Sequence, residues 1–235
     1  MDLNIYFVAL KNDVKDLWNK AKTIYSSPSH WRSTEWLLFA CCLLFLILSL
    51  FIDQVVRNEM ALLHGQSQDQ IFSFGHWYGQ GTATLWLFVI FYLSGLVAQG
   101  GRLRFTGLMI GEAYLFSGVL TISLKSLLGR WRPYTNHGCF AFSPFTAGPN
   151  DHLSFPSGHV TVAFALSSVM AGLHSSRIWK ACWYLLALIT ATSRIYHDDH
   201  WFSDVVCSAL IGTAVGVWLI KNHRYNHLGI AGDHE

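Results

Sequence analysis

Residues 34–56 read TEWLLFACCLLFLILSLFIDQVV, and nearly every position up to Ile52 is apolar. A helix needs about 20 predominantly apolar residues to cross the hydrocarbon core of a bilayer. Comparable stretches recur along the chain, at about 82–99, 105–124, 158–174, 178–196 and 203–220. We therefore predict an all-α polytopic membrane protein, built as a bundle of six transmembrane helices.

The composition of the chain agrees with this prediction. Hydrophobic residues make up 52% of the sequence and charged residues only 13%, about half the charged share of a typical soluble domain. Such a chain has too few charges to cover a surface in water, whereas lipid covers an apolar exterior. The fourth and sixth stretches are rich in small residues, which let helices pack closely in lipid. We expect these two helices inside the bundle.

The chain divides into an N-terminal segment of residues 1–33, a membrane domain of residues 34–222 and a C-terminal tail of residues 223–235. The N-terminal segment carries apolar residues at a spacing that suits one face of a helix. It either lies flat on the membrane surface or forms a loosely held tail, and the sequence leaves both open. The first span starts too far from the N-terminus for a cleaved signal peptide.

Lysine and arginine are unevenly distributed between the connections. They gather before the first span, at residues 100–104, at residues 175–180 and after residue 220. Because cytoplasmic connections of membrane proteins are enriched in these residues, we expect both termini in the cytoplasm. The connections before the fourth and sixth spans then face the periplasm or the exterior, in what we take to be a bacterial inner membrane.

The first of three polar patterns in these connections is Lys125-x6-Arg132-Pro133. The two cations are seven residues apart, so they share a face if the third span continues as a helix, which Pro133 would end. Taken alone, such residues are typical of cations that reach toward lipid headgroups.

The second pattern is Pro156-Ser157-Gly158-His159, at the start of the fourth span. Proline suits the first turn of a helix, and the free N–H groups of such a start attract anions. Glycine at 158 would let an anion approach the backbone, with His159 beside it. The alternative is an ordinary helix cap and an interfacial histidine.

The third pattern is Ser193-Arg194-x5-His200-x3-Asp204. His200 and Asp204 have the spacing of one helix face, so the carboxylate can accept a bond from one ring nitrogen and leave the other free to attack. Arg194 offers a planar fork suited to phosphate oxygens. The alternative is a structural salt bridge at the membrane edge.

Together the three patterns resemble those of the type-2 phosphatidic acid phosphatase superfamily, which includes vanadium haloperoxidases and bacterial acid phosphatases. The match covers residues 125–204, and the six spans are similar to the integral-membrane branch. The resemblance implies phosphate ester hydrolysis through a phosphohistidine, without a metal or another cofactor. It implies that His200 is the nucleophile, Asp204 orients it and His159 is the general acid. It also implies a phosphate site made by Lys125, Arg132, Ser157, Gly158 and Arg194.

A site at the membrane surface predicts a phosphorylated lipid as substrate, such as phosphatidic acid, phosphatidylglycerol phosphate, a polyprenyl diphosphate or a lipid A-type glycolipid. The patterns do not separate a phosphatase from a phosphotransferase that uses another lipid as acceptor. A binding or transport protein and a vanadium-dependent oxidase are further alternatives, disfavoured by the intact catalytic residues and by the six spans. We expect no nucleic-acid partner, no obligate protein partner and no metal.

Several neighbouring residues carry weaker hypotheses. We expect Asp198 and Asp199 to face solvent, the alternative being contact with a polar group of the substrate. Glu112 lies deep in the third span, where we expect an interhelical hydrogen bond, and Asp53 is expected at the interface. Aromatic residues in the outward segments 57–81 and 134–155 either shape a headgroup pocket or anchor the protein at the interface.

Overall fold

The computed structural model describes residues 3–26, 29, 31–145 and 150–230. Within these residues the chain forms helices joined by turns, and the only pairing of extended backbone is an isolated bridge between Arg130 and Phe142. The helices are α1 (Leu3–Ser26), α2 (Ser33–Leu50), α3 (Asp53–Ala61), α4 (Gln66–Gly79), α5 (Gly81–Val97), α6 (Gly101–Leu128), α7 (Gly158–Leu173), α8 (Arg177–Tyr196) and α9 (Phe202–Ile230). The prediction of an all-α membrane bundle is confirmed, and α2 and α5 to α9 correspond to the predicted spans.

The helices differ in how they meet the requirements for crossing a membrane. In the part of the chain that the structure describes, α2, α6 and residues Phe202–His223 of α9 are each long and apolar enough to span it. Helices α4 and α5 pass the same test together, as a pair bent by 55°. Helix α7 is apolar but shorter. The bundle therefore combines full-length spans with a bent pair and a shorter apolar helix.

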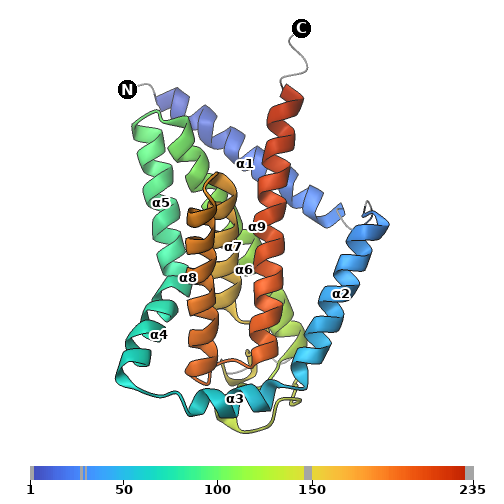
Figure 1. Cartoon of the computed structure of the whole chain (residues 1–235). Helices are drawn as coiled ribbons and strands as arrows, with labels where there is room; N and C mark the ends of the chain where they lie inside the picture. The colour runs from blue at the N-terminus through green and yellow to red at the C-terminus, as the bar shows by residue number, and fades with distance from the viewer. Residues whose placement is uncertain (1–2, 27–28, 30, 146–149, 231–235) are drawn as a thin grey trace.

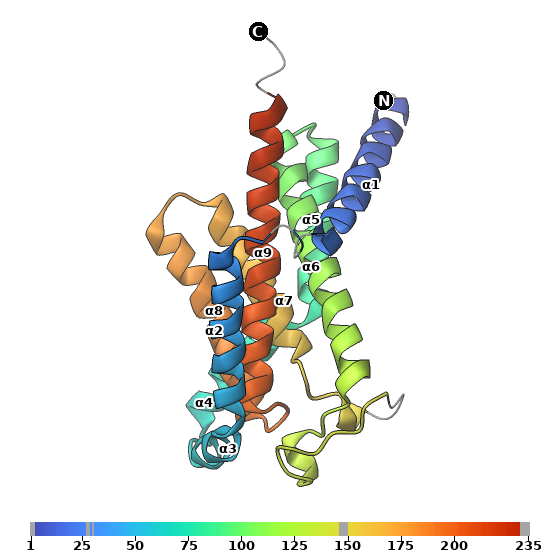
Figure 2. The same cartoon turned by 90° about the vertical axis from the view of Figure 1, so that its right-hand side faces the viewer.

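Helix α7 lies at the centre of the bundle, as its small residues predict. Residues 160–171 are all buried, and they pack against α6, α8 and α9. Figures 1 and 2 show α7 enclosed by its neighbours from two directions. Because the start of α7 carries Ser157 and His159, this central position places both residues inside the bundle.

The connection after the first span differs from the prediction. The first span ends at Leu50 instead of continuing to residue 56, and the chain turns into the separate short helix α3. Residues 66–79, expected in a connection, form α4, which packs against α8 and α7. Asp53, predicted at the interface, is completely buried.

Helix α1 is attached to the bundle by its charged face. Lys20 lies 2.7 Å from Glu112 of α6, and Arg104 of α6 lies 2.6 Å from Asp13. Val14 and Trp18, on the apolar face, are exposed. The loosely held tail is therefore excluded for α1, and Glu112 makes the interhelical bond that was predicted. Residues 231–235 of the predicted tail lie outside the described residues, and α9 stays helical to Ile230.

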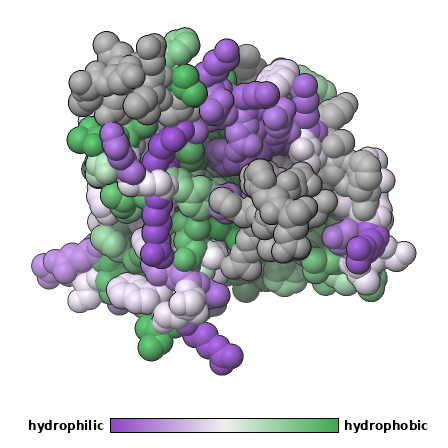
Figure 3. Space-filling model, turned by 90° about the horizontal axis from the view of Figure 1, so that it is seen from above, coloured by the Kyte–Doolittle hydropathy of each residue, from purple (hydrophilic) through white to green (hydrophobic). Residues whose placement is uncertain are grey.

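The two ends of the bundle are formed by different parts of the chain. Helix α1 begins and α9 ends at one end of the molecule, while α3 and the connection between α6 and α7 lie at the other. Viewed onto the first end, hydrophilic side chains gather beside hydrophobic ones (Figure 3). The three polar patterns all belong to the second end.

Candidate active site

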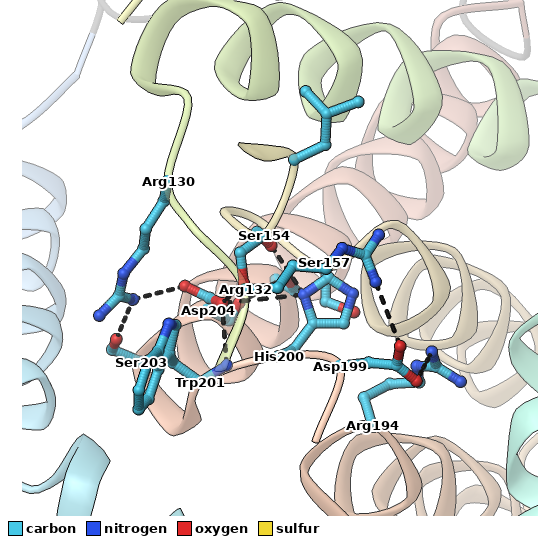
Figure 4. A network of polar contacts seen from close by, with 12 residues as sticks. Arg130, Arg132, Ser154, Ser157, Arg194, Asp199, His200, Trp201, Ser203 and Asp204 are labelled. Carbon is cyan, nitrogen blue, oxygen red and sulfur yellow. Dashed lines mark hydrogen bonds and ion pairs between the residues drawn. The ribbon is translucent and has the colours of Figure 1, made fainter. Parts of the chain in front are cut away.

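The three patterns converge at the end of the bundle opposite the termini. The last turn of α6, the start of α7, the last turn of α8 and the turn before α9 meet there, joined by the end of α4. Figure 4 shows the side chains that these segments contribute. Six of the eight residues predicted for the site come from these segments, whereas Arg132 comes from the connection after α6 and Asp204 from the first turn of α9.

The first pattern reaches the site by a different route from the one predicted. Helix α6 ends at Leu128, and Gly129 follows with a left-handed φ of 58°. A side chain at 129 would collide with the carbonyl oxygen of Ser143 at 1.9 Å, so only glycine fits this turn. Gly129, and not Pro133, ends the helix, and Arg132 lies in extended backbone instead of on a shared helix face with Lys125.

The second pattern forms the start of α7. Ser157 is the cap residue and Gly158 the first helical residue, so Pro156 precedes the helix and does not lie in its first turn. A Cβ added at Gly158 would meet the methyl group of Thr121 at 3.8 Å, an ordinary van der Waals contact. Gly158 also lines a cavity beside this helix start.

The third pattern places His200 in the turn before α9 and Asp204 in the first turn of that helix. Nδ1 of His200 donates to the carbonyl oxygen of Ser154 at 2.7 Å, and a carbonyl can only accept. Asp204 Oδ2 is 3.7 Å from Nδ1, too far for a hydrogen bond. The orienting bond predicted for Asp204 is made by Ser154, because His200 and Asp204 do not share a helix face. Nε2 of His200 keeps its lone pair.

Asp204 fixes the backbone and side chains around His200 through its hydrogen bonds. It accepts bonds from the hydroxyl group of Ser154 and from the N–H of Trp201, the latter at 2.9 Å. Arg130 also donates to it and, at 2.6 Å, to Asp53. Arg130, Asp53 and Asp204 are completely buried. Sequence reasoning missed Arg130 and Asp53, although Arg130 is only two residues from Arg132.

His200 is neutral across the ordinary pH range. It is 2% exposed, and burial, together with the nearby cations Lys125 and Arg132, lowers its pKa to about 4. A neutral imidazole with a fixed Nδ1–H is the form that can attack through Nε2.

Arg132 and Arg194 are joined by one carboxylate. Arg132 Nη1 lies 3.3 Å from Oδ1 of Asp199, and Arg194 Nη2 donates to Oδ2 of the same residue. Figure 4 shows Asp199 between the two guanidinium groups. The prediction that Asp198 and Asp199 face solvent is wrong for Asp199, which turns toward the two arginines. Asp198 stays partly exposed and pairs with Arg57 of α3 at 2.6 Å.

His76 of α4 is a further site residue that the sequence did not reveal. Its Nδ1 accepts a hydrogen bond from Nη1 of Arg194, and its ring centroid is 4.9 Å from that of His159. The end of α4 can come this close because Gly79 has no side chain: a Cβ there would lie 2.5 Å from Cγ2 of Thr190 and 3.0 Å from Cβ of His159. No sequence signal near residue 76 resembles the three patterns.

Among the buried polar atoms that have no hydrogen-bond partner within the described residues are Nε of Arg194, Oγ of Ser157 and Oγ1 of Thr121. Buried donors are rarely left unpaired without a reason. Thr121 lines a cavity of about 230 Å³, and Gly158, the neighbour of Ser157, lines it too. Its lining comes from α4, α5, α6 and α7 and consists of Gly79, Gly81, Tyr114, Gly118, Thr121, Ile122, Lys125, Gly158, His159 and Val162.

The donor set of the site suits an anion. Lys125 has its ammonium group on the carbonyl oxygen of Leu153, beside the cavity. Arg132 and Arg194 add two guanidinium groups, and the start of α7 adds backbone N–H groups. In the described residues, no group of three or more His, Cys, Asp or Glu side chains is placed to hold a metal ion.

Comparison with known proteins agrees with this geometry. The family model described as the PAP2 superfamily matches residues 106–228, more than half of the chain. A lipid A 1-phosphatase of Rhizobium johnstonii is 32% identical over 123 residues, covering 52% of this chain and 48% of the relative. Lipid phosphate phosphatase 1 of Arabidopsis thaliana is 30% identical over 169 residues, covering 60% of this chain and 50% of the relative. The chain thus spans about half the length of these curated relatives.

A solved structure has the same fold. The PAP2-type phosphatidylglycerolphosphate phosphatase of Bacillus subtilis superposes with a TM-score of 0.55 at 19% identity, covering 80% of this chain and 96% of that one. At this identity the likeness concerns the fold. It supports the six-helix bundle in which the three patterns meet.

Proposed function

Because the chain belongs to the PAP2 superfamily, we propose that it is a membrane lipid phosphatase that acts through a phosphohistidine on His200. The observation that carries this proposal is the set of unpartnered donors, Nε of Arg194 and Oγ of Ser157, beside a histidine whose free nitrogen is Nε2. Donors placed where phosphoryl charge develops are the main catalytic device of phosphoryl transfer.

In the first step, Nε2 of His200 attacks the phosphorus atom and the bond from phosphorus to the leaving oxygen breaks. His159 gives its proton to that oxygen. The negative charge of the substrate phosphate favours the protonated form of His159. Lys125, Arg132, Arg194 and the N–H groups at Ser157 and Gly158 bind the phosphoryl oxygens.

In the second step, a water molecule attacks the phosphohistidine. His159, now neutral, takes a proton from the water, the phosphorus–nitrogen bond breaks, and inorganic phosphate leaves. His200 regains its lone pair while Ser154 still holds its Nδ1–H. Asp204 takes no proton. It fixes Ser154 and stabilises the positive charge that His200 carries while phosphorylated.

The substrate that fits this site is a lipid with its phosphate at the membrane surface. The cavity beside His159 lies between α4, α5, α6 and α7 and is lined mainly by glycine and apolar residues. It can receive the atoms next to the leaving oxygen. The relatives include a lipid A 1-phosphatase, a lipid phosphate phosphatase and a putative undecaprenyl-diphosphatase, names that favour a lipid as the substrate of this chain.

Phosphate release from a panel of lipid phosphates in detergent tests the proposal. The panel should contain phosphatidic acid, phosphatidylglycerol phosphate, a polyprenyl diphosphate and a lipid A, with His200→Ala as the control. We expect release from at least one lipid by the parent protein and none by the variant. Equal release by both proteins would contradict the assignment of His200.

The same assay addresses metal dependence and the alternative of a phosphotransferase. We propose that no metal takes part, so EDTA should leave the rate unchanged and orthovanadate should inhibit. Strong inhibition by EDTA contradicts this part of the proposal. Free phosphate released without a lipid acceptor favours hydrolysis, whereas release that requires a second lipid favours transfer.

A further inference from the structure

Asp199 joins the two arginines that should bind the phosphoryl group. One of its oxygens contacts Arg132 and the other contacts Arg194. The side chains of the arginines are 9% and 5% exposed, and that of Asp199 is 25% exposed. A carboxylate between two guanidinium groups resembles the way in which two oxygens of a phosphate would bind them.

The backbone of the turn before α9 directs Asp199 to this position. The N–H of Asp199 donates to the carbonyl oxygen of Arg194 at 3.2 Å, so the turn folds back over the last turn of α8. Asp198 has a left-handed φ of 56°, and the chain reverses there. The two neighbouring carboxylates therefore point to different partners, Asp198 to Arg57 and Asp199 into the site.

We propose that Asp199 is an internal competitor of phosphate, a carboxylate that occupies the arginine pair of the empty site and must be displaced when the substrate binds. This inference rests on the proposed function of the site. Without Asp199 the site would hold buried arginines with no counter-ion, which is costly. When Asp199 is present, an anion must displace it from the two arginines. The binding free energy of the anion is then only the difference between its own contacts with the arginines and the contacts that Asp199 loses.

The competition has a consequence for the end of the reaction. Inorganic phosphate is the last product to leave, and it is held by the same arginines. When phosphate dissociates, Asp199 returns to Arg132 and Arg194, so the arginines are never left unpaired. Asp199 therefore weakens product binding, and it sets the affinity of the site for any phosphate-like anion.

A purely structural role for Asp199 predicts the opposite sign. If its task were to hold the arginines in place, removing its charge would loosen them and weaken the binding of phosphate. If it competes, removing its charge strengthens that binding. Asp198 supplies the matched control, because it is adjacent, has the same chemistry and pairs with Arg57 outside the arginine pair.

The test measures the binding of inorganic phosphate and orthovanadate to the full chain in detergent, by calorimetry and by inhibition of turnover. We expect Asp199→Asn to bind both anions roughly tenfold more tightly, because hydrogen bonds to charged groups contribute on that scale. Asp198→Asn and Asp199→Glu should keep the parent affinity. Unchanged or weaker binding by Asp199→Asn overturns the inference.

The two proposals fail in different ways. If the parent protein binds phosphate, and Arg194→Gln abolishes that binding while Asp199→Asn leaves it unchanged, the phosphate site stands and the competitor does not. If neither the parent nor any variant binds phosphate or vanadate, the proposed site itself is wrong and the inference falls with it.

Discussion

Arg130 and Arg132 are two residues apart, yet they belong to two regions with different purposes. Arg130 lies behind His200, completely buried, with Asp53 and Asp204 as its partners. Arg132 lies in front, 8% exposed, and its carboxylate partner Asp199 is partly exposed and shared with Arg194. In the rear region each of these charged groups has its partner within the chain, because Arg130 pairs with both carboxylates. In the front region cations exceed carboxylates and donors stay unpaired, which marks the place where a ligand belongs.

The comparison predicts its largest effect at Arg130. Arg130→Met removes the cation between two buried carboxylates, and breaking a buried pair in this way costs about 3–5 kcal/mol. We expect the apparent Tm in detergent to fall by roughly 10 °C. Arg57→Met removes a more exposed pair and should lower Tm by no more than about 2 °C. Equal shifts for the two variants would remove the distinction between a buried network and a surface pair.

The front region predicts a loss of rate with little loss of stability. Arg132→Lys keeps the charge but loses the planar fork, so we expect kcat/KM to fall by roughly 10²–10³-fold. The apparent Tm should stay within about 2 °C of the parent value. A drop in Tm as large as that of Arg130→Met would show that Arg132 is a structural residue like its neighbour.

We expect a smaller loss of rate when His76, in the same region, is substituted. His76→Leu removes the acceptor for Nη1 of Arg194, so we expect kcat/KM to fall about tenfold. His76→Asn can accept the same bond and should recover most of the rate. If the asparagine variant is as slow as the leucine variant, His76 acts through its packing against His159 and not through Arg194.

The smallest expected effect is in the pH profile. Neutral His200 is the attacking form, so activity is present above its pKa of about 4 and is lost as the pH falls through that value. After correction for the ionisation of the substrate phosphate, the acid limb of kcat/KM should lie near pH 4. A limb near 6.5, the ordinary value for histidine, would show that His200 is not desolvated.

Sequence reasoning predicted the front region better than the rear. The front residues stand in ordered patterns with a chemical meaning, and the structure brings all of them to one end of the bundle. The bond from His200 to Ser154 was missed because it uses a backbone carbonyl, which no residue pattern reveals. Arg130 was overlooked because its partners Asp53 and Asp204 are 77 and 74 residues away.

The fold could be predicted wherever the length of an apolar stretch specifies a membrane-spanning helix. The spans α5 to α8 follow from hydropathy and small residues, within a few residues at each end, whereas α9 begins as predicted but continues to Ile230. The end of α2 could not be predicted, because Val55 and Val56 continue the apolar pattern beyond the break at Phe51 and Ile52. The break depends on the buried pair of Asp53 with Arg130, a contact between distant segments. The docking of α1 depends in the same way on Lys20 and Glu112.

The central claim is that His200 becomes covalently phosphorylated in front of a fixed rear network. The direct measurement is rapid acid-free quenching of the protein with a lipid labelled in its phosphate, followed by identification of the labelled residue. The account predicts an acid-labile, base-stable label on His200, present in the parent and absent in His200→Asn. Turnover with no label on His200, or a label that persists in His200→Asn, would contradict it.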